Sequence, residues 1–237
     1  MKNAIITLGL LLCACDSGSD EGESTLRFTA WGEDFIEQGI PAEEFVDGWS
    51  VTFETFEVTL EGVEADGTAL DSSHVVDVSE PSGGEGHEIG TVVVPASGTP
   101  LASWSITSVV AVGTATKDDV TKTFDWSFDT PTRYVDCDTE TPLTAGETTD
   151  VVLTIHADHL FYDDLDSEEP GVAFDLIAAA DADGDGEVTM AELGQQSISG
   201  EVRYQVGSRN IEDLGGFIEA QVATLGHING EGHCDVQ

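Results

Sequence analysis

Residues 49–63, Trp49-Ser-Val-Thr-Phe-Glu-Thr-Phe-Glu-Val-Thr-Leu-Glu-Gly-Val63, predict one long β-strand. Apolar side chains alternate with polar ones, which is the period of a strand that buries one face. The alternation runs through Val51 and Phe53 and then slips, because the next apolar residue is Phe56. One extra residue is what a β-bulge, or a corner between two sheets, requires. The stretch therefore predicts a β fold with a bent long strand.

Six further runs of this kind surround the long strand. Each is rich in Val, Thr, Phe or Trp and is bounded by Gly, Pro, Asp or Ser, which is typical of strands and turns. The runs are residues 26–31, 74–78, 90–94, 104–116, 120–128 and 148–155. Many short strands with regular turns form a sandwich or a barrel. We expect a β-sandwich domain over residues 25–165.

The hydrophobic period changes after this domain. Residues 172–180 predict a short helix with Pro170 near its first turn, where proline is favoured. A second helix is expected to begin at Glu192. We assign residues 166–200 to a small helical unit.

One more helix is predicted near the end of the chain. Asn210 is its expected N-cap with Asp213 at the third position, apolar residues follow on one face, and Gly226 provides the stop. Residues 201–237 thus form a C-terminal helix and tail. The expected fold class is mainly β: a β-sandwich followed by a small α-helical segment and a C-terminal helix.

Regularly spaced carboxylates lie between the first two predicted helices. Calcium takes six to eight oxygen ligands, and a twelve-residue loop can wrap them around one ion. The segment Asp181-Ala-Asp-Gly-Asp-Gly-Glu-Val-Thr-Met-Ala-Glu192 resembles the calcium loop of the EF-hand family. The resemblance implies ligands at Asp181, Asp183 and Asp185, the carbonyl of Glu187, Thr189 through a water, and a bidentate Glu192.

This loop departs from the family in three ways. The sequence has no second loop to pair with Val188, Gln196 and Ser197 stand where calcium sensors place apolar residues, and Ala180 replaces the bulky residue before the first ligand. A sensor needs an apolar groove that opens on binding. We therefore expect a fixed, structural calcium site.

The N-terminus predicts export. Lys2 precedes a short apolar run that is too short to span a bilayer, and the segment around Cys15 is similar to the lipobox of bacterial lipoproteins. We expect a signal peptide at residues 1–14, lipid on Cys15, and a flexible tether at 15–24. The expected location is the bacterial cell envelope. The sequence does not determine whether the lipid anchor lies in the inner or the outer membrane.

Two cysteines remain after the N-terminal segment, Cys137 and Cys234. An even pair in an exported protein is typical of a disulfide. Such a bridge would close much of the second half of the chain and draw its end toward the sandwich. A pair of thiolate metal ligands is the alternative.

Four of the six histidines fall in two close pairs. One pair follows the last predicted strand, and the other lies in a Gly-rich turn beside the predicted disulfide. Imidazole nitrogens suit zinc and copper, so a second metal site is the alternative to a purely calcium-binding role. Its candidate ligands are His156, His159, His227 and His233, with Asp158 or Asp163 nearby.

The order of the predicted strands and turns resembles that of one class of secreted proteins. A first strand at 26–31, a long second strand with the acidic turn Glu64-Ala-Asp-Gly67, and the turn at Val94-Pro95 are similar to secreted, copper-handling β-sandwich proteins associated with methanobactin. This likeness implies metal handling and transfers no individual residue.

The charge excludes one class of partner. The chain has 47 acidic and 7 basic residues, a formal net charge of −40, which repels nucleic acid. No G-x-S-x-G, H-E-x-x-H, Walker or C-x-x-C motif is present in the sequence. We expect a non-enzymatic protein, with a hydrolase left open, attached to the membrane by lipid. A protein partner is not identified.

Overall fold

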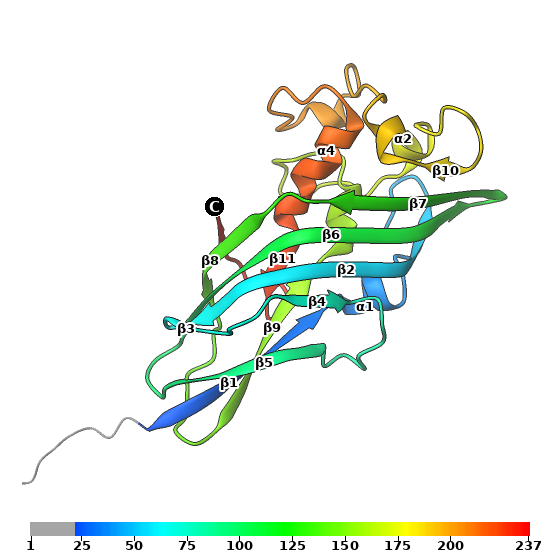
Figure 1. The fold of residues 1–237 in the computed structure, drawn as a ribbon. Coiled ribbons are helices and arrows are strands. Elements are labelled where there is room, and N and C mark those ends of the chain that lie inside the picture. The colour runs from blue at the N-terminus through cyan, green and yellow to red at the C-terminus, as the bar shows by residue number, and fades with distance from the viewer. Residues whose placement is uncertain (1–21) are drawn as a thin grey trace, which may run out of the picture.

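The computed structural model describes residues 22–237, which form a mainly β fold of two curled sheets with short helices at one end (Figure 1). The predicted signal peptide, Cys15 and most of the tether lie outside the described residues. The strands are β1 Glu23–Trp31, β2 Ser50–Ala65, β3 Thr68–Ala69, β4 His74–Asp77, β5 His87–Pro95, β6 Leu101–Lys117, β7 Val120–Phe128, β8 Thr132–Asp138, β9 Thr148–Ile155, β10 Glu187–Val188, β11 Gly226–Ile228 and β12 Asp235–Val236. The helices are α1 Glu33–Glu37, α2 Asp175–Ala178, α3 Met190–Leu193 and α4 Leu214–Gln221, with 3₁₀ turns η1 Ala157–Phe161, η2 Arg203–Gln205 and η3 Val222–Thr224.

The larger sheet is built around β2 and β6. Five of its strands lie side by side in the order β10-β7-β6-β2-β3. Two more strands join them: β8 pairs with β6, and β4 pairs with β2. The register between β2 and β6 shifts between Phe53 and Thr55, so the bulge predicted from the slip in alternation is confirmed. The inward face of this sheet buries Phe56, Trp104 and Trp126 completely.

The smaller sheet has the order β11-β9-β1-β5. β1 lies parallel to β9 and antiparallel to β5. Leu26 and Phe28 of β1 and Val151 and Leu153 of β9 are fully buried. These apolar rows alternate with more exposed residues along each strand, which is what two packed sheets require. The predicted β-sandwich fold is confirmed.

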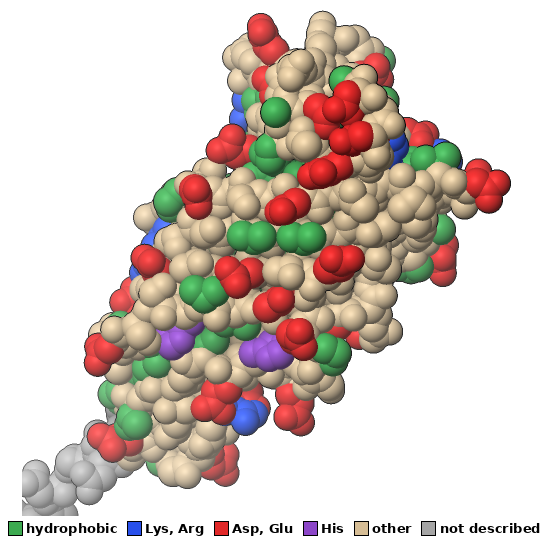
Figure 2. Space-filling view, turned by 45° about the vertical axis from the view of Figure 1, so that its right-hand side comes forward, with side chains coloured by type: hydrophobic (Ala, Val, Ile, Leu, Met, Phe, Trp, Pro, Cys, Tyr) green, Lys and Arg blue, Asp and Glu red, His purple; other side chains and the backbone are tan. Residues whose placement is uncertain are grey.

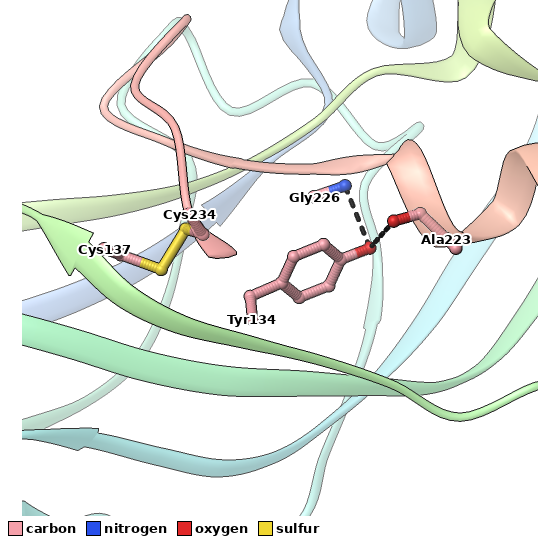
Figure 3. Close-up of a disulfide and its surroundings, with 5 residues drawn as sticks. All are labelled: Tyr134, Cys137, Ala223, Gly226 and Cys234. Carbon is pink, nitrogen blue, oxygen red and sulfur yellow. Dashed lines mark hydrogen bonds between the residues drawn. A yellow bond between two sulfur atoms is a disulfide. The ribbon is translucent and has the colours of Figure 1, made fainter. Parts of the chain in front are cut away.

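The last segment of the chain is fastened to both sheets. The predicted disulfide between Cys137 of β8 and Cys234 is present, and it joins residues 97 apart in sequence (Figure 3). Beside it, the backbone N–H of Gly226 donates to the hydroxyl of Tyr134 at 3.1 Å. A Cβ at Gly226 would lie 2.5 Å from the Tyr134 ring, so only glycine fits there. These contacts fix the start of β11 against the sandwich.

Two local features differ from the expectations. The sequence pattern does not predict β8, because its apolar residues Tyr134, Val135 and Cys137 lie among the charged residues Arg133, Asp136 and Asp138. Asn210 is not the N-cap of the C-terminal helix, because the first helical residue is Leu214. Three further differences concern the helices. The N-cap of α4 is Asp213, whose side chain accepts from the N–H of Gly216 at 2.8 Å, and a 3₁₀ turn replaces its last predicted turn. The helices that flank the predicted calcium loop are only one turn long, α2 and α3.

The visible surface carries mostly acidic charge. Figure 2 shows acidic side chains spread over one face and gathered near its upper end, with few basic ones between them. Such a field concentrates cations near the protein. Within residues 22–237, no helix has the length and apolar composition needed to cross a membrane.

Candidate metal centres

The predicted calcium loop lies between α2 and α3 at the helical end of the sandwich (Figure 1). Carboxylate oxygens of Asp181, Asp183 and Asp185 lie within 4.8 Å of one another. The two oxygens of Asp181 accept from the N–H groups of Gly184 at 2.8 Å and Gly186 at 3.0 Å. These bonds curl the backbone around the first carboxylate. Three carboxylates thus converge at one point of the loop, and carboxylate oxygens are the ligands that calcium prefers.

Glu192 closes the loop from its other end. Its carboxylate accepts from the N–H of Thr189 and the N–H of Ala182, both at 3.0 Å. The hydroxyl of Thr189 in turn accepts from the N–H of Glu192, which completes a capping box at the start of α3. The bonds from Thr189 lower the pKa of Glu192, so this carboxylate is charged at neutral pH. The side chain of Glu187 is exposed, and its expected contribution is its backbone carbonyl.

The sandwich supplies the strand that a partner loop would otherwise supply. β10 pairs in parallel with β7, Glu187 opposite Thr123 and Val188 opposite Phe124. The N–H of Thr123 donates to the carbonyl of Gly186 at 2.9 Å. The indole N–H of Trp126 donates to the carbonyl of Val188 at 2.8 Å in a fully buried position. Val188 itself is buried, so the loop is joined to the core by both polar and apolar contacts.

A lysine reaches the same loop from β7. The ammonium of Lys122 forms an ion pair with Asp181, whose side chain has no exposed surface. Lys122 and the loop amides hold the pKa of Asp181 below its ordinary value. Sequence reasoning missed this contact, because nothing in the local pattern relates Lys122 to residues nearly sixty positions later. Any cation bound at Asp181 has to share this carboxylate with the ammonium or displace it.

The second set of candidate ligands gathers where β9 ends. β11 pairs with β9 so that His227 lies opposite Thr154, two residues before His156. The ring centroid of His156 lies 5.3 Å from that of His159 and 4.4 Å from that of His227. The ring centroids of His159 and His227 are 5.4 Å apart. His233 is exposed and lies outside this group, 5.8 Å from His227. Three of the four predicted histidines therefore form one cluster.

Carboxylates complete this cluster. Ligand atoms of His156, Asp158 and His159 lie within 4.8 Å of one another, and so do those of His156, His227 and Glu231. His156 belongs to both groups. Asp163, the other carboxylate expected nearby, instead pairs with Arg203 and accepts from the N–H of Gly171. Glu231 was not expected from the sequence, because only the turn after β11 brings it close.

Several buried atoms of the cluster lack partners. His156 Nε2, His227 Nδ1 and Asp158 Oδ1 have no hydrogen bond within the described residues. A buried polar atom left unpaired costs about 1–3 kcal/mol, so three in one place make this cluster a candidate binding site. The donor set of imidazole nitrogen and carboxylate oxygen fits a divalent transition metal.

The surroundings keep two imidazoles of the cluster, those of His159 and His227, neutral. Burial, and then the neighbouring rings, lower the pKa values of His159 and His227 to about 4. Burial raises the pKa of Asp158, and it also raises that of Glu33, a residue the sequence did not single out. Glu33 has a φ of +53°, a conformation that few non-glycine residues adopt. Neutral imidazoles are the form that binds metals.

Comparisons with known proteins add little. No family model matches the chain, and no curated protein is similar to it. Among solved structures, the chain is similar to a proposed cell adhesion protein from Bacteroides eggerthii, with 11% identity over 57% of this chain and 46% of that one, and a TM-score of 0.17. This chain therefore matches less than half of that protein's length, and a likeness at this TM-score carries no argument.

Proposed function

We propose that this chain is a calcium-binding protein of the bacterial cell envelope, in which one ion at residues 181–192 braces a short helical segment against the β-sandwich. The observation that carries the proposal is the convergence of three carboxylates in a loop whose strand is paired with β7. Six to eight oxygen ligands are available from the side chains of Asp181, Asp183, Asp185 and Glu192, the carbonyl of Glu187, and water at Thr189.

The pairing with β7 favours a structural role over a signalling one. Sensor loops pair with a second loop and open an apolar groove on binding. Here Val188 is held by its pairing with β7 and by the hydrogen bond from the Trp126 indole, so the loop and its two flanking helices have little freedom to open. At about 1 mM calcium and a dissociation constant near 10⁻⁴ M, linkage stabilises the folded state by about 1.4 kcal/mol. That is enough to order one segment.

Calcium titration by calorimetry tests the proposal. The wild-type chain should bind one calcium, and the double variant D181N/E192Q should bind none. The matched control E43Q/D119N removes the same two charges at exposed positions outside the loop and should leave binding unchanged. Undiminished calcium uptake by D181N/E192Q would reject the site.

The location is a separate part of the proposal and rests on the N-terminal sequence. A thioether-linked lipid on Cys15 would place the folded part outside the cytoplasm, where millimolar calcium is available. In cells fed a labelled fatty acid, the wild-type chain should carry the label and C15S should not. Equal labelling of both would remove the anchor from the proposal.

A further inference from the structure

The histidine cluster at the end of β9 is a built site with no assigned occupant. His156 is 7% exposed, and its Nε2 has no hydrogen-bond partner within residues 22–237. A ring nitrogen of His156 also belongs to two groups of converging imidazoles and carboxylates. We propose that His156, His159, His227 and Asp158 bind one divalent transition-metal ion of the zinc class. This goes beyond the calcium function and uses none of its residues.

The spacing of the rings matches a shared ion. With metal–nitrogen bonds of about 2.0–2.1 Å in tetrahedral geometry, three imidazoles that point at one ion have ring centroids about 5 Å apart. The three distances within the cluster are 4.4, 5.3 and 5.4 Å. His156 is common to both groups of converging ligand atoms, so the ion lies beside His156. Within each group of three, ligand atoms now up to 4.8 Å apart need to approach to about 3.3 Å, the separation of two ligands of a tetrahedral ion.

Hydrogen bonds around the cluster determine which atom of His159 faces the ion. The hydroxyl of Thr224 donates its only proton to the carbonyl of Gln221 at 2.8 Å. At 2.9 Å from His159 Nδ1, the same oxygen can therefore only accept, so Nδ1 carries the proton of the ring. His159 Nε2 is left with a free lone pair. A hydrogen bond that fixes the tautomer is typical of metal-binding histidines.

Tyr162 orients the carboxylate in the same way. Its hydroxyl donates to Asp158 Oδ2 at 2.9 Å, and Asp158 Oδ1 is left buried without a partner. Three free nitrogens and one free oxygen then make a four-coordinate set with a charge of −1. Imidazole and carboxylate ligands suit zinc and copper(II), and both described cysteines are tied up in the disulfide, so no thiolate competes.

A cavity adjoins one side of the cluster. It has a volume of about 360 Å³ and is lined by His159, Tyr162, Gln221, Thr224, His227 and His233, but not by His156 or Asp158. His233 is exposed at the edge of this group, so it is placed to meet an incoming ion before the buried ligands do. Glu231 offers a further carboxylate oxygen within 4.8 Å of ligand atoms of His156 and His227.

Zinc titration of the full chain tests the proposal. After chelation and with calcium held at saturation, the wild-type chain should bind one zinc. H156Q and H227Q should each bind zinc at least about 100-fold more weakly, since even residues that only orient ligands cost 10–100-fold. The control H74Q/H87Q removes two histidines outside the cluster and should bind zinc like the wild type. Equal affinity in H156Q and wild type would overturn the site.

Two further measurements cover a variant that does not fold. Cobalt(II) added to the wild-type chain should give the visible absorption of a four-coordinate site, and zinc should abolish it. T224V removes the partner of His159 Nδ1 and should weaken zinc binding about 10–100-fold with the calcium affinity unchanged. Absence of a cobalt spectrum, or zinc binding that stays at the wild-type level in T224V and H227Q alike, would refute the proposal.

Discussion

Replacing Trp126 by phenylalanine should separate the calcium loop from the sandwich. Trp126 is fully buried, and its indole N–H donates to the carbonyl of Val188 at 2.8 Å. Phenylalanine keeps an aromatic ring but leaves that carbonyl without a donor, which costs about 1–3 kcal/mol. Val188 is the residue through which the loop pairs with β7, so the loss falls on the junction and not only on the core.

Trp104 provides a matched control. It is also fully buried and stacks on Tyr134 with ring centroids 4.5 Å apart, as Trp126 stacks on Phe124 at 4.5 Å. The indole nitrogen of Trp104, however, has no hydrogen-bond partner in the described part of the chain. W104F and W126F therefore remove the same atoms from a similar environment, and they differ in one hydrogen bond.

Urea unfolding with and without calcium gives the comparison. W126F should lose about 1–3 kcal/mol more free energy of unfolding than W104F. Calcium affinity should fall about three- to tenfold in W126F and stay unchanged in W104F, because only the first contact couples the loop to the core. If the two variants lost equal stability and bound calcium equally, the brace would be refuted.

Three other predictions follow from single contacts. K122M removes the ammonium that competes at the calcium loop and should raise calcium affinity about tenfold by calorimetry; weaker binding would show that the lysine helps the site. C137S/C234S should lower the free energy of unfolding by about 4.7 kcal/mol on the chain-entropy model. The same variant should bind zinc more weakly and calcium as well as the wild type does. A urea unfolding curve like that of the wild type would contradict the first expectation. Hydrogen bonds from Lys117 and Trp49 lower the pKa of Asp175 in the folded state. The ionised Asp175 carboxylate therefore stabilises the fold at pH values above its unfolded pKa near 4, and this stabilisation is lost as the pH falls through the folded pKa. In D175N, the free energy of unfolding should therefore fall less between pH 6 and pH 3 than it does in the wild type. An equal fall in both proteins would contradict this prediction.

The sequence predicted what depends on local pattern. The slip between Phe53 and Phe56 is sufficient to locate the bulge in β2, because side chains alternate strictly along a strand. The disulfide followed from the count of cysteines. The calcium loop stays a prediction, and it could be made from the sequence because all its proposed ligands fall within twelve residues.

Contacts between distant segments were not predictable in this way. The sequence left Val188 without a partner, because a parallel pairing with Phe124 joins residues whose relation only the folded sheet defines. The histidine pairs were seen, but the pairing of β11 with β9 decides that His227 joins the cluster and His233 does not. Asn210 was predicted as the helix cap with Asp213 three residues later, but both residue types can cap a helix, and in the structure Asp213 is the cap.

Hydrogen exchange at Thr123 tests the proposed calcium brace most directly. Its amide donates to the carbonyl of Gly186 at 2.9 Å, a bond that joins the loop to the sandwich. Stabilisation of about 1.4 kcal/mol by calcium should slow exchange of this amide about tenfold, with amides in the centre of β1 unchanged. Calcium binding that leaves the Thr123 exchange rate unaltered would contradict the brace.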